Sequence, residues 1–327
     1  MSARILVLGG SGYIGQQVAR ALAAGGGAQV IVASRRPRAV PGQRALALDA
    51  RNADALAGVI GGVDAVVNCV TGAPADIRAN ADALAATLRR QARAPRLVHL
   101  SSMAVYGAST GRVDEGSPLA PQSGYGCAKR DAEEALRRCA NTVLLRPGCV
   151  YGPGSLQWSV RIAQLLRERR LGDLGAAGDG CCNLVHVDDV VAAVRQALYR
   201  DGVAGRTFNL SLADAELPTW NEYFVEFARR LGAVPVARIA ARRLPFETQL
   251  LAPLLKLAEL GLRQLGVDAS GLPPAITPSM RTLWQQRIRL DSRRAAAELV
   301  LRWKPLDEGL AETAASLRVA PLTRQPA

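Results

Sequence analysis

Short apolar runs rich in β-branched residues alternate with alanine-rich stretches through the first half of the chain, and this alternation limits the possible folds most strongly. We predict strands over 4–8, 29–34, 45–49, 65–70, 97–102 and 142–146, with helices over 13–24, 53–60, 76–93 and 124–139 between them. Strands separated by helices need crossover connections, which produce a parallel sheet with helices on both faces. The sequence therefore predicts a doubly wound α/β fold with its ligand crevice at the carboxyl ends of the strands.

A glycine-rich turn directly follows the first predicted strand and opens the first predicted helix. Residues 9–15 read Gly-Gly-Ser-Gly-Tyr-Ile-Gly, with glycines at the first, fourth and seventh positions. Glycine permits a tight turn and a close approach of pyrophosphate to backbone N–H groups, and the helix N-terminus adds favourable partial charge. This arrangement is typical of a Rossmann-type dinucleotide-binding sheet. The residues expected to contact the cofactor here are Gly9, Ser11, Gly12, Tyr13, Ile14 and Gly15.

The end of the second predicted strand indicates which dinucleotide binds. A carboxylate at this place accepts hydrogen bonds from a ribose 2′-hydroxyl, whereas arginine accommodates a 2′-phosphate. The chain has Ser34, Arg35 and Arg36 here, which favours NADP(H) over NAD, with two solvated loop arginines as the alternative. Asp49 and Ala50 follow the third predicted strand, where they are placed to meet the adenine. Asp49 is nearly as well placed to cap the next helix.

Tyr125 and Lys129 are four residues apart, which places a phenol and an ammonium on one face of a predicted helix. A tyrosine hydroxyl has an ordinary pKa near 10, and a neighbouring cation favours its ionised form. Such a pair can serve as a general acid or base, although Tyr-x-x-x-Lys spacing is also common by chance on exposed helices. Ser102, at the end of the fifth predicted strand, is placed to hold a substrate oxygen at the same crevice.

Five segments in a fixed order make the sequence resemble the extended short-chain dehydrogenase/reductases, the NAD(P)-dependent epimerase/dehydratase family. These segments are the glycine turn, Ser-Ser-x-x-Val-Tyr-Gly (101–107), the Tyr-x-x-x-Lys pair, Arg-Pro-x-x-Val-Tyr-Gly-Pro-Gly (146–154) and Val-His-Val-x-Asp-Val (185–190). The pattern of 178–190 looks closest to the branch of dihydroflavonol reductases and 3β-hydroxysteroid dehydrogenases.

The resemblance implies roles for individual residues. Ser102, Tyr125 and Lys129 would be catalytic, with Lys129 also bonding the nicotinamide ribose, and Asn80 would match the family's helix asparagine. The loop 68–72 would lie along the cofactor and 147–150 along the nicotinamide. The further residues placed at the cofactor are Cys69, Val70, Thr71, Pro147 and Val150, and those placed at the substrate are Met103, Cys149 and Tyr151. Family members commonly dimerise through the Tyr-x-x-x-Lys helix, so a homodimer is implied.

The sequence leaves three functions open. We favour a reductase or dehydrogenase that acts on a ketone or secondary alcohol. Sugar-nucleotide epimerases and dehydratases of this family usually carry a diphosphate-binding arginine where this chain has Cys182. A preference for NADP also suits net reduction better than hydride recycling. A sugar-nucleotide epimerase or dehydratase remains the alternative, and a non-catalytic NADP-binding regulator is the third reading.

The 327 residues divide into two predicted parts. Residues 1–154, with 183–212 returning, would form the NADP-binding domain, while 155–182 and 213–318 would form a smaller, mainly helical substrate-binding lobe. Residues 319–327 would form a frayed tail. The largely apolar stretch 244–265 could dock on a membrane or line a pocket, but we expect it mainly to make core.

Composition disfavours nucleic acid as a binding partner and leaves a small-molecule substrate. The net charge of +13 comes mostly from scattered arginines, and the 4% aromatic content offers few stacking platforms for nucleic acid, so none is expected to bind. The start of the chain lacks a signal-peptide pattern and no long uncharged apolar run occurs, which predicts a cytoplasmic protein without a membrane span. Six cysteines without paired spacing and two histidines predict free thiols and no metal site.

Overall fold

The computed structural model describes residues 2–37, 42–269 and 271–319. The chain divides into two compact units. The first unit contains Met1–Val150, Val185–Asp214 and Leu290–Lys304, and the second contains Tyr151–Leu184, Ala215–Arg289 and Pro305–Ala327. Apart from Val319, the tail predicted over 319–327 lies outside the described residues.

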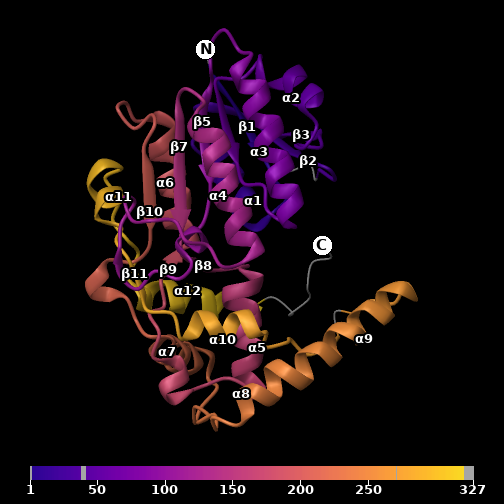
Figure 1. The fold of residues 1–327 in the computed structure, drawn as a ribbon, viewed down its shortest axis with the longest axis vertical. Coiled ribbons are helices and arrows are strands. Elements are labelled where there is room, and N and C mark those ends of the chain that lie inside the picture. Colours follow the sequence, from indigo (N-terminus) through magenta and orange to yellow (C-terminus); the bar gives the residue numbers. More distant parts are fainter. Residues whose placement is uncertain (1, 38–41, 270, 320–327) are drawn as a thin grey trace. The chain divides into compact units, whose positions relative to one another are not determined.

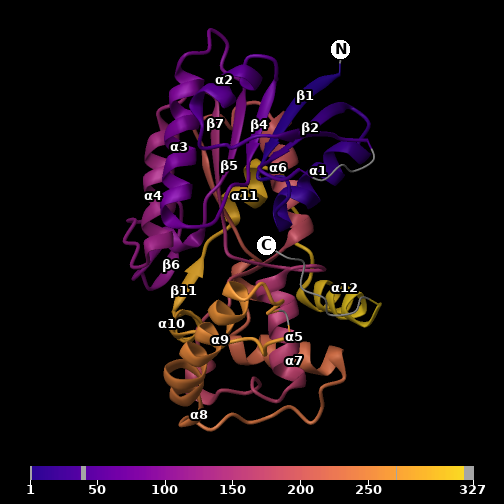
Figure 2. The same ribbon diagram turned by 90° about the vertical axis from the view of Figure 1, so that its right-hand side faces the viewer.

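A seven-stranded sheet forms the centre of the first unit, with the strand order β10-β7-β5-β4-β1-β2-β3. Every neighbouring pair in it is parallel (Figures 1 and 2). The strands are β1 (Ala3–Leu8), β2 (Ala28–Ser34), β3 (Arg44–Ala47), β4 (Ala65–Asn68), β5 (Arg96–Leu100), β7 (Thr142–Pro147) and β10 (Thr207–Leu210). The strand order reverses between β1 and β4, which is where such sheets open their ligand crevice. The predicted doubly wound fold is confirmed.

Helices cover both faces of this sheet, as Figure 2 shows. One face carries α1 (Tyr13–Ala24), α6 (Val187–Tyr199) and α11 (Arg293–Glu298), and the other carries α2 (Ala53–Ile60), α3 (Pro74–Arg89) and α4 (Gly124–Arg137). Successive side chains of β1 point to opposite faces, so Ile5 and Val7 join the first core and Leu6 and Leu8 the second. A parallel sheet buried on both faces needs such continuous apolar runs, which explains why the strands were readable in the sequence.

The second unit is mainly helical and packs around an aromatic cluster. Trp220, Tyr223, Phe224 and Phe227 lie on one face of α7 (Trp220–Leu231), and Trp284 packs edge-on against Phe224. Its other helical segments are η2 (Leu156–Val160), α5 (Arg161–Arg167), η3 (Gly175–Gly178), η4 (Asp214–Glu216, starting at the last residue of the first unit), α8 (Arg243–Pro245), η5 (Phe246–Leu251), α9 (Ala252–Gln264), α10 (Pro278–Trp284) and α12 (Leu306–Val319). The remaining short elements of the chain are η1 (Met103–Tyr106), β6 (Gly111–Val113), β8 (Cys149–Tyr151), β9 (Leu184–His186) and β11 (Ile288–Leu290).

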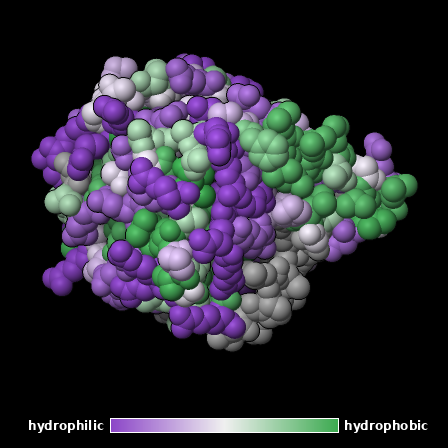
Figure 3. Space-filling view, turned by 90° about the horizontal axis from the view of Figure 1, so that it is seen from below, coloured by the Kyte–Doolittle hydropathy of each residue, from purple (hydrophilic) through white to green (hydrophobic). Residues whose placement is uncertain are grey.

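The apolar stretch 244–265 does not mainly make core, contrary to the expectation from sequence. Leu244 is buried, but Phe246, Leu250, Leu254 and Leu257 are exposed along η5 and α9. Figure 3 shows hydrophobic residues gathered on this part of the surface. Among the described helices, none combines the length and the apolar character that a transmembrane segment needs.

The two units differ from the predicted division most at residues 290–304, and their other boundaries are shifted by two to four residues. Residues 290–304, predicted to belong to the substrate lobe, lie in the first unit. Ala295 and Leu299 are fully buried in the core that contains β10 and α6. Which ligand each unit binds stays a prediction.

Candidate functional site

The glycine turn between β1 and α1 is packed too closely for side chains. A Cβ atom on Gly15 would lie 2.4 Å from the Gly9 carbonyl oxygen, and one on Gly9, whose φ is +71°, would lie 2.9 Å from the carbonyl carbon of Cys69. Helix α1 starts after Gly12 without a side-chain cap, and its first turn contains no acidic residue. The free N–H groups at this helix start can therefore receive an anion.

Three polar residues lie at the end of β2, where a 2′-phosphate was predicted to bind. The Ser34 hydroxyl is buried, with the residue only 9% exposed, and it has no hydrogen-bond partner within the described part of the chain. Arg35 and Arg36 follow it and are exposed. That Ser34, Arg35 and Arg36 hold a 2′-phosphate stays a prediction.

The Asp49 carboxylate is already bound by its neighbour Arg51. The Arg51 side chain donates to it from Nε at 2.9 Å and from Nη2 at 2.6 Å, and these contacts hold the pKa of Asp49 at about 2. Helix α2 is capped by Asn52, whose side chain accepts from the N–H groups of Asp54 and Ala55. The alternative that Asp49 caps this helix is therefore wrong, because Asn52 lies at the N-cap position. The adenine contact stays a prediction.

Helix α4 brings Tyr125 against the end of β5. The helix is capped by Ser123, and it approaches η1 so closely that a Cβ on Gly126 would lie 2.5 Å from the Ala104 carbonyl oxygen. This approach brings the Tyr125 hydroxyl near the side chains of Ser102 and Thr71, whose polar interactions with it lower its pKa. Burial of the hydroxyl has the larger effect, so the pKa of Tyr125 is raised above 10 although 36% of the residue is exposed.

Lys129 is buried one helical turn beyond Tyr125. Its ammonium donates to the carbonyl oxygens of Leu100 at 2.7 Å and Val70 at 3.3 Å, and it lies 5.9 Å from the centre of the Tyr125 ring. Burial lowers the pKa of Lys129 to about 8, against the opposing effects of Cys69 and Glu133. The sequence led us to expect a lowered pKa for Tyr125. In the protein alone, burial outweighs the opposing effects of Ser102 and Thr71 and favours the protonated phenol.

Asn80 contacts the loop of residues 68–72 instead of the Tyr125 hydroxyl. Its side chain accepts from Asn68 at 2.8 Å and donates to the Ala50 carbonyl oxygen at 2.8 Å. Asn68 also contacts Nδ1 of His99 at 3.1 Å and accepts from the N–H of Val70 at 3.2 Å. Asn80 therefore supports the loop whose Val70 carbonyl holds Lys129.

The remaining predicted residues lie near these groups in the chain. Cys69 follows β4, and burial raises the pKa of its thiol to about 12. Pro147 ends β7, and Val150 and Cys149 are buried in β8, as is Met103 in η1. Tyr151 is the first residue of the second unit. Cys182, where related sugar-nucleotide enzymes carry an arginine, is fully buried in the second unit.

A buried ion pair next to Lys129 was not predicted from the sequence. Glu133 and Arg146 are each 1% exposed, and Arg146 donates to both Glu133 oxygens, at 2.8 and 2.6 Å. Ser101 donates to the same carboxylate at 2.5 Å. Ser101 and Arg146 belong to two of the motifs that carry the family resemblance, but neither residue was assigned a role from the sequence. The signal that could have found Glu133 is its place four residues after Lys129, on the same helix face.

Comparison with known proteins begins with a family model. The model described as NAD dependent epimerase/dehydratase family matches residues 5–211. This range contains the glycine turn, Ser102, Tyr125 and Lys129.

Two similar proteins are named as reductases. The chain is 33% identical to 2′-dehydrokanamycin reductase of Streptomyces kanamyceticus over 246 residues, which cover 70% of this chain and 67% of that protein. It is 29% identical to a 3-diazoavenalumate denitrifying reductase of a Streptomyces species over 272 residues, which cover 74% and 86% of the two chains.

Solved structures share the fold at low sequence identity. The human epimerase family protein SDR39U1 (isoform2), with NADPH, matches with a TM-score of 0.71 and 20% identity, covering 96% of this chain and 100% of that one. The dTDP-glucose 4,6-dehydratase of Bacillus anthracis, with NAD, matches with a TM-score of 0.73 and 19% identity, covering 97% of each chain.

Proposed function

Because the chain belongs to the NAD dependent epimerase/dehydratase family, we propose that it is an NADP(H)-dependent oxidoreductase that transfers hydride between the nicotinamide and a ketone or secondary alcohol. One observation carries the proposal: the Tyr125 hydroxyl lies near the Ser102 and Thr71 side chains, while Lys129 is buried with its ammonium 5.9 Å from the centre of the Tyr125 ring. A phenol held in this way can deliver a proton to a defined point at the carboxyl edge of the sheet.

The residues at the crevice fit a nicotinamide dinucleotide. The side-chain-free turn at Gly9 and Gly15 and the uncapped start of α1 suit a pyrophosphate. The unsatisfied Ser34 hydroxyl and the exposed Arg35 and Arg36 suit a 2′-phosphate, which is the reason for proposing NADP(H). When bound, the dinucleotide would supply or accept the hydride.

The residues of the chain would manage the proton and the charge on oxygen. In reduction, Tyr125 gives its phenolic proton to the substrate carbonyl oxygen, which the Ser102 hydroxyl also binds. The raised pKa of Tyr125 keeps it protonated at neutral pH, as a proton donor must be. Lys129, with a pKa of about 8, is mostly protonated at pH 7 and stabilises the tyrosinate left behind. Oxidation of an alcohol uses the same steps in reverse.

Net reduction is the direction we propose, and the names of two similar proteins support it. Both are reductases, one of them named for a dehydrokanamycin, which makes a keto group on a small polar molecule the first substrate class to screen. The fully buried Cys182 cannot replace a diphosphate-binding arginine, which disfavours the sugar-nucleotide alternative. Retention of Ser102, Tyr125 and Lys129 disfavours a non-catalytic regulator.

The cofactor is tested by titrating the protein separately with NADPH and NADH and following nicotinamide fluorescence. Replacing Arg35→Ala should weaken NADPH binding about 10- to 100-fold by removing a charge-assisted hydrogen bond, and should leave NADH binding unchanged. Arg20→Ala, on the exposed side of α1, is the control and should alter neither. Tighter binding of NADH than NADPH, or a cofactor that copurifies without exchanging, would favour the hydride-recycling alternative.

Catalysis is tested with Tyr125→Phe in a screen of ketones and alcohols for net NADPH consumption. We expect kcat to fall about 10²- to 10⁴-fold, because the phenyl ring has no proton to transfer, while NADPH affinity stays within a few-fold. Turnover at the wild-type rate by this variant would refute the assignment of Tyr125.

A further inference from the structure

Buried polar side chains form a continuous hydrogen-bonded network through the first unit, from the end of β5 to the surface of the unit. Ser101 donates to Glu133, Glu133 binds Arg146, Arg146 donates to the Tyr106 hydroxyl at 2.7 Å, and Tyr106 donates to Asn209 at 2.7 Å. The backbone N–H of Asn209 then donates to the Glu115 carboxylate at 2.9 Å. These residues come from α4, β7, η1 and β10, from the residue directly after β5 and from the segment after β6.

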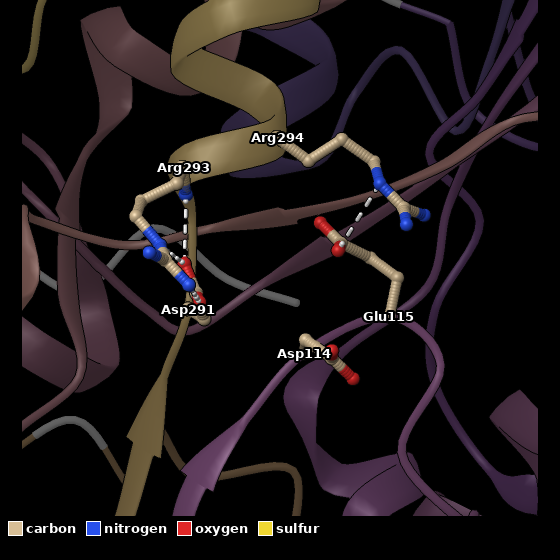
Figure 4. Close-up of a pocket in the computed structure, with 5 residues that line it drawn as sticks. All are labelled: Asp114, Glu115, Asp291, Arg293 and Arg294. Carbon is tan, nitrogen blue, oxygen red and sulfur yellow. Dashed lines mark hydrogen bonds and ion pairs between the residues drawn. The ribbon is translucent and has the colours of Figure 1, made fainter.

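Charged side chains at the surface hold the outer end of this hydrogen-bonded network, as Figure 4 shows. Glu115 pairs with Arg294 at 3.6 Å, and Arg293 binds Asp291 with Nη2 at 2.7 Å. The Asn209 side chain donates to the Asp291 carbonyl oxygen at 3.2 Å, which ties β10 to this cluster. The pocket in Figure 4 is therefore lined by two ion pairs and by Asp114, whose carboxylate accepts from the Gly116 N–H and the Ser117 hydroxyl.

The inner end of this hydrogen-bonded network contacts the elements that carry Ser102, Tyr125 and Lys129. Tyr125, Lys129 and Glu133 recur every four residues and so lie along one face of α4. Ser101 immediately precedes Ser102 on the partner element. Helix α4 is thus joined to the end of β5 at two points, by Lys129 to the Leu100 carbonyl oxygen and by Glu133 to Ser101.

Stability alone is a weak reason for such an arrangement. Burying both members of an ion pair costs desolvation that their attraction often only offsets, whereas their hydrogen-bond geometry fixes the positions of the groups they join. Arg146 spans from β7 to α4 with two bonds to one carboxylate, which constrains both the distance and the angle between these elements.

We propose that Glu133 is a positioning residue of the reaction: through Ser101 and Arg146 it sets the register of α4 against β5 and β7, and thereby the placement of Tyr125 and Lys129 relative to Ser102. The proposal rests on the proposed function, since it concerns the geometry of that catalytic group. A displacement of about 1 Å in such a group can cost on the order of 100-fold in rate.

The test is Glu133→Gln, which keeps the side-chain shape and removes the charge. We expect kcat to fall about 10- to 100-fold, with the NADPH dissociation constant changing less than about threefold because the glycine turn and Arg35 are untouched. In a crystal structure of the variant, the 2.7 Å contact between Lys129 Nζ and the Leu100 oxygen should lengthen. A variant with wild-type kcat and an unchanged contact would overturn the proposal.

The pH profile provides a readout that lost stability alone would not move. The titratable or charged groups facing Lys129 are Tyr125 and Glu133 on α4, Cys69 after β4 and His99 on β5. Glu133 raises the pKa of Lys129, so its removal should shift the alkaline limb of the kcat profile to lower pH. An unshifted limb would count against the proposal.

Two controls separate positioning from folding. Arg137→Ala removes only the exposed partner of Glu133, 3.3 Å from it, and should leave the pH profile and the melting temperature close to wild type. Glu247→Gln breaks a buried arginine pair in the second unit, Arg170–Glu247 at 2.6 Å, and should lower the melting temperature without shifting the pH profile.

The double variant Glu133→Gln/Arg146→Gln decides between the two roles. It removes both charges of the pair, so no buried arginine is left without its carboxylate, and the melting temperature should recover relative to Glu133→Gln while kcat stays low. Recovery of kcat together with stability would reduce Glu133 to a structural residue and overturn the proposal. Full turnover by Tyr125→Phe would instead refute the proposed function itself, so the two failures are distinguishable.

Discussion

Lys129 combines a buried ammonium with hydrogen bonds to two backbone carbonyls, and its burial makes it sensitive to pH. Its pKa is about 8 in the folded protein, against 10.5 for an ordinary lysine. Between these values the unfolded chain binds more protons than the folded one, so the contribution of Lys129 to the free energy of unfolding rises with pH from 8 to 10.5 and is constant below 8.

The first prediction compares wild type with Lys129→Met in urea unfolding at pH 7, 8, 9 and 10. The difference in unfolding free energy, wild type minus variant, should increase with pH across this range. Tyr125 and Cys69, whose raised pKa values act in the opposite direction, are present in both proteins and largely cancel. A difference that stays flat would mean that Lys129 is not held at a lowered pKa.

Gly15 gives the second prediction. In Gly15→Ala the new Cβ would lie 2.4 Å from the Gly9 carbonyl oxygen and 2.9 Å from the Gly10 Cα, so the turn must open. We expect a loss of about 1–3 kcal/mol in stability, as for other overpacked sites, together with loss of dinucleotide binding. Gly58→Ala in α2, which meets nothing within 4 Å, is the matched control and should stabilise by about 0.5–1 kcal/mol. Equal effects of the two substitutions would contradict this account.

Residues that act through local spacing were predictable, and residues that act through distant contacts were not. Tyr125 and Lys129 lie four residues apart on one helix, so the sequence shows their common face. Glu133 acquires its role only when β5 and β7 bring Ser101 and Arg146 to it. Asp49 was a poor choice as a cap because Asn52 directly precedes α2 and accepts from the N–H groups of Asp54 and Ala55, whereas Asp49 accepts from the N–H of Arg51.

At the scale of elements, the six strands predicted over 4–146 are all present in the sheet, and some of their ends differ in an informative way. The predicted strands 65–70 and 97–102 end in the structure at Asn68 and Leu100. After Asn68 the apolar pattern continues through Cys69 and Val70, so periodicity could not show where that strand ends. After Leu100 come the polar residues Ser101 and Ser102, which the prediction included in the strand although they mark its end.

Helix α9 shows the reverse problem, since its leucines predicted core and the structure exposes them. In the third prediction, Leu257→Gln, at a residue 66% exposed, should change the free energy of unfolding by less than about 0.5 kcal/mol. Leu84→Ala in α3, at a fully buried leucine, should cost about 2–5 kcal/mol. Chemical denaturation measures both. A large loss from Leu257→Gln would show that this face is covered in solution.

At the scale of the whole molecule, the first unit is built from three separate stretches of chain. The return of residues 290–304 escaped prediction because it contains only the last residue of β11 and the six-residue helix α11, too short for a periodic signal. Ala295 and Leu299 are the buried residues that it contributes to the core, and Leu301 and Trp303 pack against that core.

The fourth prediction tests that contribution. Leu299→Ala should lower the free energy of unfolding by about 2–4 kcal/mol, because the removed atoms leave a cavity beside β10. Val300→Ala, at the exposed neighbouring residue, should have an effect below about 0.5 kcal/mol. Similar small effects for both variants would remove 290–304 from the core of the first unit.

The three-part construction of the first unit also dictates the order in which it can be completed during synthesis. When β7 has left the ribosome, its outer edge has no neighbour until β10 follows, and the core beside β10 stays open until Leu299 is made. An unpaired strand edge invites pairing with other chains. The nascent protein must therefore protect this edge while residues 148–206 are translated, and the core beside β10 while residues 215–289 are translated. A message cut short before codon 304 yields a product that chaperones and proteases can recognise as unfinished.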